Sequence, residues 1–322
     1  MRIVRSLQGT PLWARGAAVA LGNFDGVHRG HQVVLRAARD AARQDGCAFG
    51  VLTFEPHPRT LFRPEAAPFR LTPFRGKALR LREEGVEVLY VGHFTRAFSR
   101  LSARAFVEEL LVGALGVRHV AVGQDFVFGQ GRGGNASLLR EMAQQGGFGL
   151  SVVAPAGESP GALFKSSAAR TLLTEGRPRD AAEILGAWWR VTGRVRHGDA
   201  RGRTLGYPTA NIALGPLLRP RFGIYAVWAS IEGEASRPAV ASLGLRPMFQ
   251  GDVPLLEVHL FDFAGDLYGR HLCVDVVEFL RPEQTFTDVA ALVRQMDADS
   301  ARARAILADP DNAAGRFRRG AP

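Results

Sequence analysis

The sequence is short of cysteine and of long apolar runs. Its 322 residues include only two cysteines, Cys47 and Cys273, which lie far apart and in apolar surroundings. Two isolated thiols do not make a disulfide-rich secreted scaffold, and they provide no paired zinc ligands. No apolar run approaches the length of a bilayer span, and residues 1–7 lack the apolar core of a signal peptide. These absences predict a cytoplasmic protein that is not inserted in a membrane.

Acidic residues are also in the minority. The chain has 31 Asp and Glu residues against 41 Lys and Arg residues, and its net charge is +10. Arginine dominates and is spread along the chain, with one local run of Arg316, Arg318 and Arg319 near the end. No zinc finger and no aromatic-rich RNA-binding signature accompanies this charge. Small polyanionic substrates explain a basic protein as well as nucleic acid does, so the charge leaves both classes of partner open.

The hydrophobic pattern predicts two domains. In the first half, short apolar runs alternate with amphipathic stretches, which is typical of a parallel sheet flanked by helices. The expected strands are 17–21, 49–54, 86–91, 119–122 and 150–153, and the expected helices are 31–44, 73–84, 102–112 and 136–145. This pattern predicts an α/β domain over residues 1–186, which ends in a linker helix.

From Trp188 onward the apolar period changes to two. Further short strands follow without helices between them, and this spacing predicts a small antiparallel β-barrel over residues 187–322. The clearest strands are 223–229, 239–243, 255–261 and 272–279, and a helix is expected over 287–308.

The first domain is organised around residues 18–32, where an apolar run ends in a glycine-punctuated turn and a helical pattern follows at once. A strand, a tight loop and a helix leave backbone N–H groups and a positive dipole end facing an anion. The glycines that let this backbone bend and approach a ligand are Gly22, Gly26 and Gly30. His28 and His31 can then donate hydrogen bonds to a phosphate. The pattern predicts a nucleotide site, and a pair of surface histidines at a helix start is the alternative.

Two later loops of this domain also carry polar side chains after expected strands. His57 stands between two prolines at the carboxyl end of strand 49–54, where it either contacts a substrate or caps the loop. Asp125 follows strand 119–122 and is placed to bind a base, a ribose or a metal. The glycine-rich run after it, which contains Arg132, predicts a flexible loop that wraps phosphates or a ring, with a plain mobile loop as the alternative.

Residues 165–170 precede another short helical pattern. A serine here can cap that helix. The hydroxyl of Ser167, together with Arg170 one turn on, can also hold a departing pyrophosphate. Capping alone accounts for the serines but not for the arginine.

Glycines and basic residues fill the stretch that leads to Thr209 and Asn211 in the second domain. A hydroxyl and an amide carbonyl are hard oxygen ligands that suit Mg²⁺ carrying ATP phosphates, and a stabilised turn is the alternative. In the later strand, alternation places Glu257 on the same face as His259 and Phe261. A carboxylate there can accept the proton of an attacking alcohol, although a solvent-facing strand glutamate has the same pattern.

From about Val19 to Leu307 the chain resembles the bifunctional riboflavin kinase/FAD synthetase family of bacteria. The segments that carry the resemblance, in the family's order, are Gly22–His31, Thr53–Pro58, Val122–Gly129, Ser167–Arg170, Gly206–Asn211 and Glu257–Phe263. The resemblance implies a nucleotidyltransferase-like, Rossmann-type domain that transfers AMP from ATP to FMN. It also implies a barrel that phosphorylates riboflavin from ATP. Riboflavin, FMN, FAD and ATP are then the small-molecule partners, with Mg²⁺ at both sites and no nucleic acid. The sequence leaves the oligomeric state open.

The resemblance also implies residue roles. The residues expected to hold ATP in the first domain are Gly22, Phe24, Asp25, Gly26, His28, His31, Ser167 and Arg170. The residues expected to bind ATP in the barrel are Gly193, Gly198, Gly206, Thr209 and Asn211, and those expected beside the flavin are Arg294, Asp297 and Arg302. FMN already carries an ionised phosphate, so the first reaction needs no base, whereas the hydroxyl of riboflavin needs Glu257. Met248 stands where the family commonly has threonine, which keeps open an FAD synthetase whose barrel only binds flavin.

Overall fold

The computed structural model describes residues 1–65, 67–157, 164–197, 202, 205–231, 234–248 and 251–315. Gly198 and the arginine run at 316–319 lie outside the described residues, as does the side chain of Met248. The chain forms two compact units. The first comprises Met1–Ala66 and Lys77–Phe164, and the second comprises Ala67–Gly76 and Lys165–Pro322.

The first unit is built on a six-stranded parallel sheet with the strand order β1-β4-β3-β2-β5-β6. Its strands are β1 (Arg2–Val4), β2 (Ala18–Leu21), β3 (Phe49–Glu55), β4 (Val88–His93), β5 (His119–Gly123) and β6 (Gly149–Val153). All four residues of β2 and the first six of β3 are buried, as expected of strands covered on both faces. This confirms the predicted parallel-sheet domain.

The order of the strands locates the ligand-binding edge of this sheet. The chain runs outward from β2 through β3 to β4 and then returns to β5 on the other side of β2. Open α/β sheets bind ligands at the carboxyl ends of strands where the order reverses. The loop that leaves β2 after Leu21 begins at this position.

The helices of the first unit follow the predicted pattern with two exceptions: α2 (Pro58–Phe62) is not predicted, and the helix expected over 102–112 differs from the expectation. The regular helices are α1 (Arg29–Gln44), α2 (Pro58–Phe62), α3 (Phe74–Glu83, whose first turn belongs to the second unit), α4 (Ala103–Ala105) and α5 (Ala136–Gly146). The single helix expected over 102–112 is instead the one-turn α4, continued by a π-helix over Phe106–Ala114. The apolar pattern of this stretch does not distinguish the two helix types, because both bury one side. Short 3-10 turns occupy Leu12–Ala14, Phe98–Arg100 and Gln130–Arg132.

The second unit is a six-stranded antiparallel barrel with the strand order β7-β12-β9-β10-β11-β8. Its strands are β7 (Trp189–Arg194), β8 (Ala210–Ala213), β9 (Gly223–Ile231), β10 (Arg237–Met248), β11 (Gly251–Leu260) and β12 (His271–Arg281). A bridge between Arg196 and Asn211 joins the segment after β7 to β8 and brings the two ends of the sheet together. The predicted barrel is therefore confirmed.

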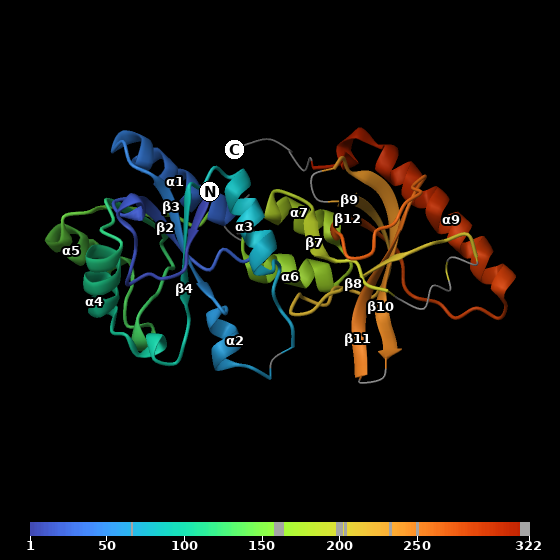
Figure 1. The fold of residues 1–322 in the computed structure, drawn as a ribbon, viewed down its shortest axis with the longest axis horizontal. Helices are drawn as coiled ribbons and strands as arrows, with labels where there is room; N and C mark the ends of the chain where they lie inside the picture. Colours follow the sequence, from blue (N-terminus) through green and yellow to red (C-terminus); the bar gives the residue numbers. More distant parts are fainter. Residues whose placement is uncertain are drawn as a thin grey trace. The chain divides into compact units, whose positions relative to one another are not determined.

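The barrel is accompanied by α6 (Ser166–Thr174), α7 (Pro178–Leu185) and α9 (Val289–Ala308), and Pro310–Asn312 forms a 3-10 turn. The long α9 packs along the outside of β9, β10 and β12 (Figure 1). Ala303 and Leu307 of α9 are buried there against Ala226 and Val277. The predicted C-terminal helix is therefore present, and it covers an outer face of the barrel.

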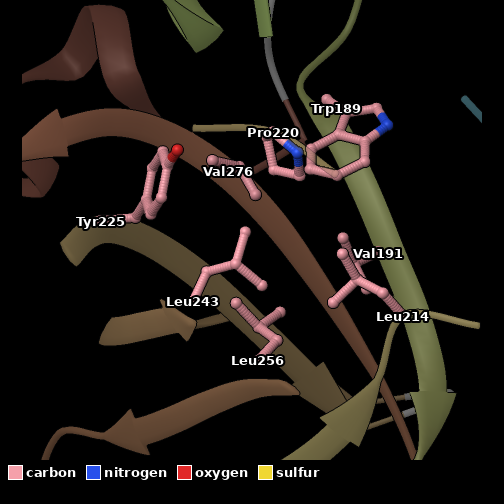
Figure 2. Close-up of a pocket in the computed structure, with 8 residues that line it drawn as sticks. All are labelled: Trp189, Val191, Leu214, Pro220, Tyr225, Leu243, Leu256 and Val276. Carbon is pink, nitrogen blue, oxygen red and sulfur yellow. The ribbon is translucent and has the colours of Figure 1, made fainter. Parts of the chain in front are cut away.

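The interior of the barrel is apolar. Figure 2 shows a small cavity there, and the eight residues that line it are Trp189, Val191, Leu214, Pro220, Tyr225, Leu243, Leu256 and Val276. The two polar groups among these side chains are used elsewhere, because the Trp189 indole donates to the Leu71 carbonyl and the Tyr225 hydroxyl donates to the Arg221 carbonyl. The cavity is thus part of the hydrophobic core, and no charged side chain lines it.

We expect Leu256→Ala to destabilise the barrel by about 2–5 kcal/mol, the usual cost of truncating a leucine in a packed core. Leu256 is 2% exposed and lines the cavity. Urea unfolding followed by tryptophan fluorescence measures the change. Val289→Ala is the matched control, because Val289 is 60% exposed and its truncation leaves no cavity. Equal effects of the two substitutions would contradict this description of the core.

The first unit should lose stability in mild acid partly through His119. Burial lowers the pKa of His119, whose Nε2 lies 2.8 Å from the Ser151 hydroxyl oxygen. Below a pH of about 6.5 the unfolded chain takes up a proton at this residue that the folded chain resists, so stability falls as pH falls. Melting temperatures between pH 7.5 and 5.5 should therefore decrease less in His119→Gln than in the parent protein. His93→Gln, at an exposed position, provides the comparison.

Candidate functional site

The loop between β2 and α1 has an unusual backbone. Phe24, Gly26 and Val27 have φ angles of +48°, +88° and +43°. Such angles suit glycine but strain a β-branched residue such as valine. The phenylalanine and valine side chains are 1% and 0% exposed, so packing holds the strained conformation. The predicted tight glycine loop is present, with two of its three left-handed positions occupied by residues other than glycine.

His28 starts helix α1 with its own side chain. Its Nδ1 accepts a hydrogen bond from the His31 backbone N–H at 3.2 Å, in the position where serine or aspartate usually caps a helix. Because Nδ1 is the acceptor, the proton of the neutral ring is on Nε2, and Nε2 is the donor nitrogen. The ring of His31 stacks on that of His28 with centroids 3.6 Å apart. The structure therefore brings the two predicted histidines together.

Gly30 permits this arrangement. A Cβ atom at Gly30 would lie 2.8 Å from the Phe164 carbonyl oxygen and 3.1 Å from the His28 ring. Asp25 is also buried in the loop, at 2% exposure. Gly22 donates its N–H to the Leu52 carbonyl at 3.2 Å, which ties the start of the loop to β3.

His57 caps α2. Its Nδ1 accepts from the Arg59 N–H at 3.1 Å, and the side chain is 9% exposed. Of the two interpretations left open by the sequence, the structure shows the capping contact, and contact with a substrate stays a prediction.

An aromatic cluster that the sequence does not reveal lies beside this loop. Phe54 lies within 6.4 Å, centroid to centroid, of Phe94, Phe98 and Phe106. Phe62 of α2 extends the cluster through Phe94 at 6.0 Å and is 64% exposed. In the sequence these residues look like ordinary core residues. Only the high exposure of Phe62, which the sequence cannot show, marks a surface where a flat ring can stack.

The glycine-rich run after β5 is more compact than the predicted flexible loop. Phe128 and Gly134 form a two-residue antiparallel bridge, and a Cβ atom at Gly134 would lie 2.7 Å from the Phe128 ring. These glycines are thus required by close packing as well as by turns. Asp125 and Arg132 are both exposed on this segment, and Arg132 has a φ of +61°.

Ser167 and Arg170 belong to the second unit, whereas the two histidines belong to the first. The Arg170 Nε donates to the Phe69 carbonyl at 2.8 Å, and its guanidinium lies over the Phe69 ring. The predicted serine cap of α6 is wrong, because the helix begins at Ser166 and the capping position is Lys165, without a side-chain bond. Ser167 is exposed in the first turn.

The barrel brings Asn211 and Glu257 together. They are direct partners in the antiparallel pair of β8 and β11, so their side chains lie on the same face. Their neighbours Ile212, Leu256 and Val258 point into the core. The carboxylate and the amide therefore lie side by side on the outside of the barrel, and Asn211 is 8% exposed. The sequence placed Asn211 in a loop, and the four-residue β8 was too short to recognise.

The segment that carries Thr209 is held from both sides. The Tyr207 hydroxyl donates to Asp297 on α9, and the His259 Nδ1 lies 2.9 Å from the Pro208 carbonyl oxygen. The rings of Tyr207 and His259 are 4.9 Å apart, centroid to centroid. Burial, followed by the bond to Asp297, raises the pKa of Tyr207. These contacts fix Thr209 between β11 and α9.

The other residues predicted in the barrel have varied surroundings. A Cβ atom at Gly193 would lie 2.3 Å from Ile212, so this glycine lets β7 approach β8. Gly206 has a φ of +80° in the turn before Tyr207. Arg294 is exposed on α9, whereas Arg302 donates to the Leu280 carbonyl at 2.9 Å and thereby anchors the helix.

Taken together, these features define a two-unit protein with a histidine pair at a helix start on an α/β sheet and a carboxylate–amide pair on a β-barrel. Family models agree with this division: one described as FAD synthetase matches residues 11–167, and one described as riboflavin kinase matches residues 185–307. Within the residues that the structure describes, no helix has the length and apolar character needed to cross a membrane.

Curated relatives named bifunctional riboflavin kinase/FMN adenylyltransferase match nearly the whole chain. The Pseudomonas fluorescens protein is 42% identical over 309 residues, 96% of this chain and 98% of the relative. The Escherichia coli K12 protein is 40% identical over 304 residues, 94% of this chain and 96% of the relative. A solved structure from Streptococcus pneumoniae, titled as a macrolide-efflux protein, has a TM-score of 0.82 at 32% identity and covers 94% of this chain and 98% of its own. The chain belongs to the bifunctional riboflavin kinase/FMN adenylyltransferase family.

We expect Tyr207→Phe to loosen the segment before β8. The substitution keeps the ring but removes the hydrogen bond to the Asp297 carboxylate. Amide hydrogen exchange over residues 205–209 should accelerate by about three- to tenfold, in line with the net value of one such bond. Tyr268→Phe is the control, because it also removes one hydroxyl but keeps the ring stacked on His197. Unchanged exchange in Tyr207→Phe would show that other contacts hold the segment.

Proposed function

We propose that this chain makes FAD from riboflavin in two ATP-dependent steps. The barrel phosphorylates riboflavin to FMN, and the α/β domain transfers AMP from ATP to FMN with release of pyrophosphate. The observation that supports this most directly is the register pair of Asn211 and Glu257, which gives the barrel a carboxylate beside an oxygen ligand. The names of the relatives and the order of the two family models agree with it. We place the boundary between the catalytic domains near residue 186.

The first reaction calls for hydrogen-bond donors and positive charge. The phosphate of FMN is already ionised, so the attacking oxygen has no proton to lose. His28 and His31 at the start of α1 donate to the α-phosphate of ATP as charge develops in the transition state. The Nε2 proton of His28, fixed by the Nδ1 contact, gives this donor a defined direction. We assign Ser167 and Arg170 to the pyrophosphate by their match to the family motif.

The second reaction requires a base. The hydroxyl of riboflavin is neutral, and Glu257 accepts its proton as the hydroxyl attacks the γ-phosphate of ATP. Glu257 is half-buried on the outer face of β11, where a substrate can reach it. Arg294 and Asp297 of α9 border the flavin in this proposal. The hydrogen bond between Tyr207 and Asp297 supports this assignment, because it links the Thr209 segment to that part of the helix.

We propose Mg²⁺ at both sites. In the barrel, the Thr209 hydroxyl and the Asn211 amide oxygen are suitable hard ligands, and the metal shields the phosphates of ATP. In the described part of the chain, no three His, Cys, Asp or Glu side chains gather as a metal site. The metal therefore depends on nucleotide phosphates for much of its coordination, as magnesium commonly does. In the first domain, Asp125 is the carboxylate that we assign to the metal.

Two further assignments complete the proposal. The exposed Phe62 ring and its neighbour Phe94 offer a stacking surface for the flavin ring of FMN at the carboxyl end of β3. Cytoplasmic location is supported by Cys47 and Cys273, which are both free thiols. An FAD synthetase with an inactive barrel is the second candidate, and it is favoured by Met248 in place of the family's threonine.

We expect His31→Ala and Glu257→Ala to separate the two reactions. His31→Ala should remove FAD formation and leave FMN formation intact, because it deletes a phosphate donor of the first domain. Glu257→Ala should do the reverse and leave conversion of added FMN to FAD intact. Chromatography of products after incubation with riboflavin, ATP and Mg²⁺ measures both steps, with each variant's unaffected reaction as the control for folding. Loss of both steps in both variants would contradict the two-site assignment. A parent protein that makes FAD only from added FMN would establish the inactive-barrel alternative.

A further inference from the structure

Lysine is scarce in this chain, and one of its lysines is completely buried. Lys77 and Lys165 are the two lysines, and arginine supplies the other 39 of the 41 basic side chains. Lys77 is 0% exposed. Basic side chains are seldom fully buried unless they are paired. A chain that uses arginine almost everywhere thus has a lysine at its most buried cationic position.

The Lys77 ammonium contacts two residues of strand β3. Its Nζ lies 3.0 Å from the Glu55 Oε1 and 3.3 Å from the Thr53 Oγ1. Thr53 is itself 0% exposed, and its hydroxyl donates to the Asn23 carbonyl at 3.2 Å. The ammonium is a donor, so the threonine hydroxyl accepts a hydrogen bond from Lys77 and donates its own to the Asn23 carbonyl. The contacts form a continuous path from α3 to the loop after β2.

This path joins the two loops of the first-domain site. Asn23 precedes the strained Phe24, and the same loop ends at His28. Glu55 is the last residue of β3 and precedes the segment with His57. Strands β2 and β3 are parallel neighbours, with Leu21 opposite Leu52, so both loops leave the sheet at one edge. The compact ammonium group of Lys77 contacts Glu55 and Thr53 at the same time, whereas the planar guanidinium of arginine requires a wider space.

We propose that Lys77 is a positioning residue for adenylyl transfer, which holds the histidine loop through Thr53 and the following loop through Glu55. This inference rests on the proposed function of the first domain. Lys77 does not reach a substrate, because it is fully buried. It acts by stabilising a loop whose left-handed Phe24 and Val27 would otherwise relax and move His28 and His31 away from the phosphate.

The first test is Lys77→Met, which keeps the length of the side chain and removes its charge. The kcat for FAD formation from added FMN should fall about 10–100-fold, with a smaller change in KM, because a displacement of about 1 Å costs that much in rate. FMN formation by the same polypeptide should stay within about twofold of the parent. Arg80→Met is the matched control: Arg80 is one turn later on α3 and pairs with Glu83 at 3.0 Å, but on the surface. It should leave both reactions within about twofold.

The second test addresses the hydroxyl. Thr53→Val removes the hydroxyl that bonds to Lys77 and Asn23 and keeps the size of the side chain, whereas Thr53→Ser keeps the hydroxyl. We expect Thr53→Val to lower the kcat for FAD formation about tenfold, and Thr53→Ser to have a kcat close to that of the parent protein. The Thr53→Val change should cost little more when Lys77→Met is already present, since both act through one path. This pair decides the question should Lys77→Met fail to fold.

Two results would overturn the proposal. One is a folded Lys77→Met protein, with a cooperative melting transition, that has the parent kcat for FAD formation. The other is Thr53→Val with the activity of Thr53→Ser. A parent protein that forms no FAD from FMN would instead reject the proposed function of the first domain, so the two failures are distinct.

Discussion

The hydrogen bond from the His31 N–H to the His28 Nδ1 determines much of the first unit's site. It starts α1 where no serine, threonine or aspartate is present, and it fixes the nitrogen of His28 that carries the proton. It also holds the two rings in a stack, with centroids 3.6 Å apart. Gly30 lies between them because a Cβ atom there would meet the His28 ring. The spacing of two histidines around a glycine is thus a requirement of the local geometry.

The barrel follows a simpler constraint, which is the alternation of side chains along a strand. Leu256 and Val258 must face the core, so Glu257 must face outward, and its partner in β8 must do the same. A shift of one residue in register would bury the carboxylate and expose the leucine. Packing in the core therefore fixes the position of the Glu257 carboxylate, and the bridge between Arg196 and Asn211 keeps β8 in place.

The sequence predicted the long elements well because their apolar periods are regular. It missed β1 and β8, which have three and four residues, and it could not distinguish a π-helix from an α-helix in residues 106–114. Motifs predicted the histidine pair and Glu257 because those residue types are chemically distinctive. They did not predict the contact between Arg170 and Phe69, or the phenylalanine cluster around Phe54, because tertiary contacts give these common residues their positions.

The two units hold the histidine pair and the Asn211–Glu257 pair in different ways. The histidines stand on a loop with two strained residues, and such a conformation persists only while surrounding contacts support it. Asn211 and Glu257 stand on paired strands, whose ladder of backbone hydrogen bonds supports them directly. A buried ion pair is costly to form unless further hydrogen bonds support it, and Thr53 supports the Lys77–Glu55 pair beside this loop. The loop needs a fixed support beneath it, and the Lys77–Glu55 pair with Thr53 supplies one.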